Sequence, residues 1–134
     1  MIGLDTNVLL RLGDEHDPDQ KARAQALVRA EGAGGSFLNP IVLSEYAWTL
    51  RRTFKLPRED VADRIAVLLE SPEFVVADPA AAARALERYR AGPADFTDYL
   101  LAEMNRRAGC AHTATFDVDA LKSGEPFSSV PALA

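Results

Sequence analysis

Cysteine is almost absent from this sequence, and histidine is scarce. Cys110 is the only cysteine, so the chain can form neither an intramolecular disulfide nor a cysteine-rich zinc site. We expect its side chain to be a small buried hydrophobic group, as free cysteines commonly are. His16 and His112 are the only histidines, and two histidines so far apart do not suggest a zinc site. A protein without disulfides is expected in the reducing cytoplasm.

Long hydrophobic runs are also missing. No window approaches the roughly 18 consecutive apolar residues that a membrane-spanning helix needs. The first apolar run is short, lacks a basic leader and contains Asp5, so we expect no signal peptide. We therefore expect a cytoplasmic protein without a membrane partner.

An excess of basic residues is the third absence. The chain has 15 Lys and Arg against 20 Asp and Glu, which gives a formal net charge of −5. This balance argues against a protein that coats nucleic acid by electrostatic attraction alone. The glycine-rich nucleotide-binding motifs and the serine hydrolase motif G-x-S-x-G do not occur. Nucleotide-binding loops and a serine nucleophile therefore have no support.

What the sequence contains is a regular alternation of predicted strands and helices. With 134 residues, of which 48% are hydrophobic, the chain fits a single domain spanning residues 1–134. Alternation of this kind predicts a mainly parallel α/β sheet of four to five strands with helices on both faces. The predicted strands are 1–5, 36–39, 73–78, 110–116 and 126–130, and the predicted helices are 6–12, 17–31, 40–53, 58–70, 79–91, 94–109 and 117–122.

Acidic residues occur where such a sheet gathers functional groups, beyond the carboxyl ends of its strands. Asp5 ends the first predicted strand, and Asp117 follows the strand 110–116. Asp95 and Asp98 are three residues apart at the start of a helix, so they share one face. Each of these acids could instead cap a helix or favour its first turn.

Glu45 is not explained by capping, because it lies in the middle of the predicted helix 40–53. Its neighbours at i−4 and i+3 are Ile41 and Trp48, so we expect its side chain to face an apolar stripe, shielded from solvent. A buried, unpaired carboxylate is costly and needs compensation. Several carboxylates together suit a hard cation such as Mg²⁺ or Mn²⁺, and such a site suits phosphodiester hydrolysis.

Four segments together resemble the PIN-domain family, and within it they are most similar to VapC-type toxins of bacterial toxin–antitoxin pairs. The segments are LDTNVLLRL (4–12), NPIVLSEYAWTLRR (39–52), ADFTDYLLAEMNRRAGC (94–110) and TATFDVDAL (113–121). The resemblance spans about residues 1–121. It implies a three-layer α/β/α sandwich with a central parallel sheet and an endoribonuclease that depends on Mg²⁺ or Mn²⁺. It also implies a cognate, VapB-like antitoxin that occludes the site, and commonly a homodimer.

The resemblance also assigns site residues. Asp5, Glu45, Asp98 and Asp117 match the four family acids in order. Our hypothesis is that Asp5, Asp98 and Asp117 hold the metal and that Glu45 orders or deprotonates the attacking water. Small polar positions that help to hold the acids and water are matched by Asn7 and Thr115, and Asp95 either caps its helix or contacts the outer ligands of the metal.

Contacts to RNA are the weakest part of the prediction. Arg11, Arg51 and Arg52 are candidates for binding phosphate, although each could equally be a solvated arginine. Tyr46 and Trp48 could stack on bases, but we expect both to pack in the core. Two other functions stay open, namely a metal-dependent DNA nuclease or phosphatase on the same acids, and a non-enzymatic protein-interaction module in which the acids are only caps.

Overall fold

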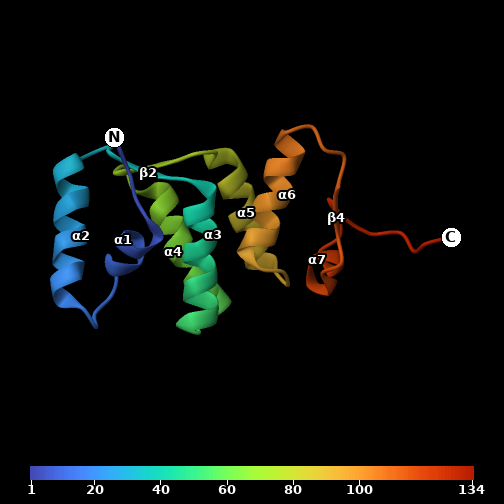
Figure 1. Cartoon of the computed structure of the whole chain (residues 1–134), viewed down its shortest axis with the longest axis horizontal. Coiled ribbons are helices and arrows are strands. Elements are labelled where there is room, and N and C mark those ends of the chain that lie inside the picture. Colours follow the sequence, from blue (N-terminus) through green and yellow to red (C-terminus); the bar gives the residue numbers. More distant parts are fainter. The chain divides into compact units, whose positions relative to one another are not determined.

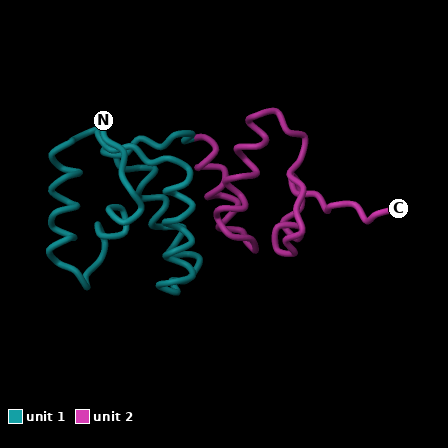
Figure 2. Tube along the Cα trace, in the orientation of Figure 1, with its two compact units in different colours: residues 1–79 teal, residues 80–134 magenta.

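The computed structural model describes all residues, 1–134, as helices joined by short parallel strands (Figure 1). It divides into two compact units, residues 1–79 and 80–134 (Figure 2). The elements of the first unit are β1 (Ile2–Gly3), α1 (Thr6–Arg11), α2 (Pro18–Glu31), β2 (Ser36–Leu38), α3 (Pro40–Trp48), the π-helical segment η1 (Thr49–Thr53), α4 (Arg58–Glu70) and β3 (Phe74–Val76). They are followed by α5 (Pro79–Ala91), α6 (Phe96–Arg107), β4 (Thr113–Thr115), α7 (Val118–Lys122) and β5 (Phe127–Ser129).

The first unit is built on a three-stranded sheet in the order β1-β2-β3. Both pairings are parallel, with Ile2 opposite Ser36 and Ser36 opposite Phe74. Parallel neighbours need crossover connections, which here are supplied by α1 and α2 between the first two strands and by α3, η1 and α4 between the next two. Each strand therefore runs in the same direction and ends at the same edge of the sheet.

The core of the first unit is aliphatic. Its fully buried side chains come from the middle strand and from α1, α3 and α4, and they are Leu9, Leu38, Leu43, Val61 and Ile65. These helices begin where local chemistry dictates. Asn39 caps α3 by accepting a hydrogen bond from the Val42 N–H at 3.0 Å, and Pro40 occupies the first helical position.

The second unit has a two-stranded parallel sheet, in which β4 pairs with β5 and α7 forms the crossover. Its core is aromatic. Tyr99 meets Phe127 edge to face with 6.1 Å between ring centroids, and its hydroxyl accepts a hydrogen bond from the Ala94 N–H at 3.0 Å. The same hydroxyl lies 2.8 Å from the Ser123 Oγ. These contacts fix the start of α6 against the end of α7.

The structure confirms the predicted α/β class, the parallel pairing and the expected four to five strands. Hydrogen bonding divides the five strands into the three-stranded and the two-stranded sheet, and the single domain over residues 1–134 stays a prediction. The expectation for Cys110 is wrong, because this side chain is exposed. No helix combines the length and apolar character needed to cross a bilayer.

Candidate active site

Asp5 occupies the turn between β1 and α1 and acts as the N-cap of that helix. Its backbone is extended, and its Oδ1 accepts a hydrogen bond from the Thr6 N–H at 2.7 Å. The side chain is exposed, and the cap uses only one of its two carboxylate oxygens. The cap thus orients the carboxylate at the end of a core strand and leaves its second oxygen outside the capping interaction.

Glu45 is joined to the Asp5 turn through Thr6. The Thr6 hydroxyl donates a hydrogen bond to the Glu45 Oε1 over 3.2 Å, and Thr6 itself is buried. The structure therefore joins Asp5 and Glu45 to the backbone N–H and the hydroxyl of one threonine. The sequence prediction had given the supporting role to Asn7, which is exposed, and had missed Thr6. Helix α1 starts at Thr6, and its rotation about its own axis determines which of Thr6 and Asn7 turns towards the core.

The predicted environment of Glu45 is wrong in one respect, because the side chain is exposed. Its helical neighbours do not shield it, since Ile41 is 69% exposed and Trp48 is 55% exposed. The buried face of α3 carries other residues: Val42, Leu43, Tyr46 and Ala47. Tyr46 is thus in the core as expected, whereas Trp48 is not.

In the second unit, Asp95 and Asp98 form a capping box at the start of α6. The Asp98 Oδ2 accepts a hydrogen bond from the Asp95 N–H at 3.1 Å. Asp98 is half-buried, and it is held at the third position of the helix. Both acids therefore do what the capping alternative predicted, and the capping box fixes the direction of the Asp98 carboxylate.

Asp117 follows β4 and caps α7, with its Oδ1 accepting from the Ala120 N–H at 2.7 Å. The Thr115 Oγ1 accepts a hydrogen bond from the Asp117 N–H at 3.0 Å. Thr115 thus holds the backbone of an acid, which is the kind of support that the resemblance implied for it. Asp119 follows in the first turn of the same helix.

Folding raises the proton affinity of Asp98. Burial raises the pKa of the Asp98 carboxyl, and the charges of Asp117, Asp95 and Asp119 raise it further, against a lowering by the hydrogen bond from the Asp95 backbone. Of the four acids matched to the family, the partly shielded one is therefore Asp98, whereas the sequence predicts a shielded Glu45. Asp119 is not among the site residues predicted from the sequence, yet its charge acts on Asp98.

The chemistry of these side chains fits a hard divalent cation. All the candidate ligands are carboxylates, the adjacent supporting groups are hydroxyls, and crowding of negative charge around Asp98 is relieved by a positive ion. No three His, Cys, Asp or Glu side chains lie close enough together in the structure to hold a metal ion as a ready-made cluster. His112 is exposed and shares a hydrogen bond with Ser128.

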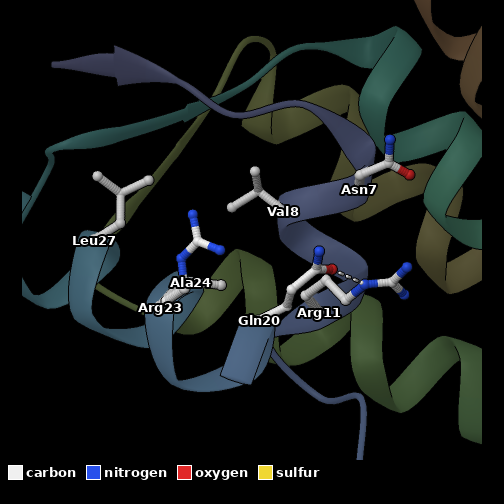
Figure 3. Close-up of a pocket in the computed structure, with 7 residues that line it drawn as sticks. All are labelled: Asn7, Val8, Arg11, Gln20, Arg23, Ala24 and Leu27. Carbon is white, nitrogen blue, oxygen red and sulfur yellow. Dashed lines mark hydrogen bonds between the residues drawn. The ribbon is translucent and has the colours of Figure 1, made fainter. Parts of the chain in front are cut away.

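The arginines predicted to bind phosphate have protein partners. Arg11 pairs with the Asp14 carboxylate at 2.8 Å and donates to the Gln20 side chain at 2.6 Å, and Arg51 donates to the Leu56 carbonyl at 3.3 Å. Arg52 is exposed at the end of η1. Figure 3 shows Arg11 at the edge of a pocket of about 440 Å³ between α1 and α2. That pocket is lined by Asn7, Val8, Arg11, Gln20, Arg23, Ala24 and Leu27.

A family model described as PIN domain matches residues 2–125, which is nearly the whole chain and includes all four predicted acids. A search of curated proteins found no match.

Proposed function

Because the chain belongs to the PIN-domain family, whose members are generally metal-dependent nucleases, we propose that it is an endoribonuclease that depends on Mg²⁺ or Mn²⁺. We propose further that it acts as the toxin of a toxin–antitoxin pair. The observation that supports the enzymatic part is the half-buried Asp98 carboxyl, whose pKa is raised first by burial and then by the charges of Asp117, Asp95 and Asp119, so that a cation would be favoured there.

In the proposed mechanism, the chain's own side chains bind, orient and accept a proton. Asp5, Asp98 and Asp117 would hold the metal with the carboxylate oxygens that their helix caps do not use. When bound, the metal would lower the pKa of a water molecule and offset the charge of the phosphate. Glu45 is fixed by the Thr6 hydroxyl at 3.2 Å and would accept the proton of the attacking water.

The test is the Asp5→Asn variant. Asparagine keeps an oxygen that can accept from the Thr6 N–H, so the helix cap survives while the charge is lost. We expect cleavage of RNA in Mg²⁺ to fall by at least about 100-fold, while the unfolding temperature stays near that of the wild type. The matched control is Asp17→Asn, because the Asp17 side chain also caps a helix, α2, by accepting from the Gln20 N–H, and Asp17 is not one of the proposed ligands.

The same pair of variants separates the alternatives. Asp5, Asp98 and Asp117 all cap helices or belong to a capping box, which is the observation that favours a purely structural role. If these acids only cap helices, Asp5→Asn and Asp17→Asn will not differ in RNA cleavage. Either both variants cleave RNA as the wild type does, or neither the wild type nor the variants cleave it. Assays on RNA, DNA and small phosphate esters with Mg²⁺ distinguish a ribonuclease from a DNA nuclease or a phosphatase.

The toxin role and its partners are supported by the resemblance of residues 4–12, 39–52, 94–110 and 113–121 to VapC-type toxins. We propose a VapB-like antitoxin as the protein partner and a homodimer as the assembly. Sequencing of RNA ends from cells that express the wild type or Asp5→Asn tests both cleavage and toxicity. Growth arrest by the wild type alone, relieved by the product of a short reading frame immediately upstream, is the expected result.

A further inference from the structure

The pocket between α1 and α2 has no part in the mechanism described above. It has a volume of about 440 Å³, and all of its lining residues belong to the first unit. Four of them come from α2 at spacings of three and four residues, which places them on one face of that helix. A few polar groups among aliphatic side chains, in a pocket of this size, are typical of a site for a small molecule.

The polar groups of the pocket include hydrogen-bond donors that have no acceptor in the protein. Arg23 pairs only with Asp19, over 3.6 Å, and donates no hydrogen bond within the protein, so its whole guanidinium group is available. The Gln20 side chain is held by its oxygen, which accepts from the Arg11 Nε at 2.6 Å. Its NH₂ group has no acceptor within the protein. The pocket therefore offers donors to a ligand that brings acceptors.

Charge favours an anion in this pocket. No acidic side chain lines it, although the chain has a net charge of −5. Asp14 neutralises Arg11 over 2.8 Å and is only 15% exposed. The Arg23–Asp19 pair differs, because 74% and 80% of these two side chains are exposed, and an ion pair in water contributes little. Arg23 is therefore the positive group that an anionic ligand can engage.

The aliphatic part of the lining requires more than an inorganic anion. It consists of Val8, Ala24 and Leu27, and Figure 3 shows the Arg23 guanidinium between Leu27 and Val8. Ala24 is buried, whereas Leu27 is 38% exposed. A bare phosphate on Arg23 would leave this aliphatic surface in water. A ligand with an aliphatic body would cover the surface, and removing it from water favours binding.

We propose that the pocket between α1 and α2 binds a small organic anion with an aliphatic body, held by Arg23 through a carboxylate or phosphate head. A guanidinium group donates parallel hydrogen bonds to either kind of head. The Gln20 NH₂ group supplies a further donor, and Val8 and Leu27 contact the body of the ligand. The proposal does not depend on the nuclease function, because none of these residues is a proposed metal ligand.

Helix α1 connects this pocket with the turn that holds Asp5. Val8 belongs to the same six-residue helix as Thr6, and Thr6 donates hydrogen bonds to both Asp5 and Glu45. A ligand that contacts α1 and α2 together stabilises both helices against local opening. Amide hydrogen exchange is therefore expected to slow across α1 and α2 when the ligand binds, and to stay unchanged in α4.

The first experiment measures binding by isothermal titration calorimetry of the whole chain in a buffer that contains EDTA. The probe is octanoate, used below its micelle concentration, and octyl phosphate carries the alternative head. Acetate and inorganic phosphate provide the head without the body, and octanol provides the body without the charge. We expect the better of the two octyl anions to bind at least about 10-fold more tightly than acetate, inorganic phosphate or octanol. The comparison of octanoate with octyl phosphate identifies the preferred head.

The second experiment repeats the titration on variants. Arg23→Gln is expected to weaken binding of the preferred octyl anion by about 10-fold or more, because a charged hydrogen-bond donor is lost. Its matched control is Arg29→Gln, since Arg29 is also an exposed arginine of α2 but does not line the pocket. Leu27→Ala is expected to weaken binding about threefold or more. Val67→Ala of α4 is its control, because Val67 is 59% exposed and lies outside the pocket.

Both controls are expected to stay within about twofold of the wild type, and all four positions are exposed, so unfolding temperatures should change little. Octanol that binds as tightly as the octyl anions would overturn the inference, because the pocket would then be an unselective apolar surface. Unchanged binding in Arg23→Gln, or an equal loss in Arg29→Gln, would also overturn it. Inorganic phosphate that binds through Arg23 as tightly as octyl phosphate would instead identify a contact for RNA phosphates. Slower hydrogen exchange in α3 or α4 alone would place the probe outside this pocket and refute the proposal.

Discussion

Asp98 shows how one side chain can both stabilise a helix and carry a charge that the fold disfavours. Its Oδ2 closes the capping box of α6, which stabilises the helix start. Its partial burial and three neighbouring carboxylates oppose its ionisation. A position optimised for stability alone would carry a neutral residue that keeps the capping acceptor. Retention of the charge is therefore what a cation-binding role requires.

The first prediction at this scale concerns Asp98→Asn in metal-free protein. The pKa of Asp98 is raised by folding, so its contribution to stability is fully present below the unfolded pKa and is lost as the pH rises through the folded pKa. Asp98→Asn avoids this loss of stability because an amide does not ionise, and it keeps an oxygen that can accept from the Asp95 N–H. We expect the unfolding temperature at pH 7 to rise by roughly 2 to 4 °C, with no such gain near pH 3.5. Thermal unfolding in EDTA between pH 3.5 and 7 measures this.

Asp60→Asn is the matched control for that prediction. Asp60 occupies the third position of α4, as Asp98 does in α6, but it is exposed. There the charge interacts favourably with the helix dipole, so its removal is expected to lower the unfolding temperature slightly. A decrease for Asp98→Asn at pH 7 comparable to that for Asp60→Asn would contradict the idea of a crowded, desolvated acid.

At the scale of elements, local sequence signals are sufficient to predict where these helices begin and end. They are insufficient to predict which face of a helix is buried. The predicted helix 58–70 is α4 (Arg58–Glu70), and the predicted helix 79–91 is α5 (Pro79–Ala91), because Pro57 and Pro79 mark their starts. The segment 41–50 is apolar at most positions. Several faces of it could therefore have been buried, and the sequence did not reveal that Val42 and Tyr46 face the core while Ile41 and Trp48 face solvent.

The difference between local sequence signals and tertiary packing also explains which parts of the site could be predicted. Asp5, Asp98 and Asp117 follow strands or begin helices, and those places are readable from residue order. The Thr6 contact to Glu45 depends on how α1 packs against α3, and the crowding around Asp98 depends on how α6 and α7 come together. Contacts between elements are set by tertiary packing, which a single sequence does not display.

The second prediction concerns the attachment of α5 to α6 through Glu103. This glutamate has only 4% of its side chain exposed, and its Oε2 accepts from Arg84 of α5 at 3.1 Å and from Arg106 of its own helix at 3.0 Å. Glu103→Gln removes the charge and keeps the shape. We expect unfolding free energy to fall by about 1–2 kcal/mol, because both arginines can be resolvated. Urea unfolding measures this, with exposed Glu87→Gln of α5 as the control.

Metal-dependent cleavage should survive Glu103→Gln at temperatures where the variant is folded, since Glu103 is not one of the proposed ligands. A variant as stable as the wild type would show that the two ion pairs contribute nothing net, as many partly exposed pairs do. Loss of cleavage without loss of stability would instead place this part of α6 in the active site.

At the scale of the whole molecule, the acidic balance predicts how RNA binding responds to salt. A protein that binds through many lysine and arginine contacts releases many counterions, so its affinity falls steeply as salt rises. This chain carries 20 acidic against 15 basic residues, and Arg11 and Arg51 are engaged within the protein. With this balance of charge, RNA binding is expected to neutralise only one or two phosphates.

We therefore expect a shallow dependence, with log K falling against log salt with a slope of roughly −0.7 to −1.4 for single-stranded RNA. Between 50 mM and 200 mM KCl the affinity of the Asp5→Asn variant should then fall only about threefold to sevenfold. Arg52→Ala is the informative companion, since loss of a phosphate contact would flatten the slope. A slope steeper than about −4 would mean that many phosphate contacts form, and the expectation drawn from the acidic balance would then be wrong.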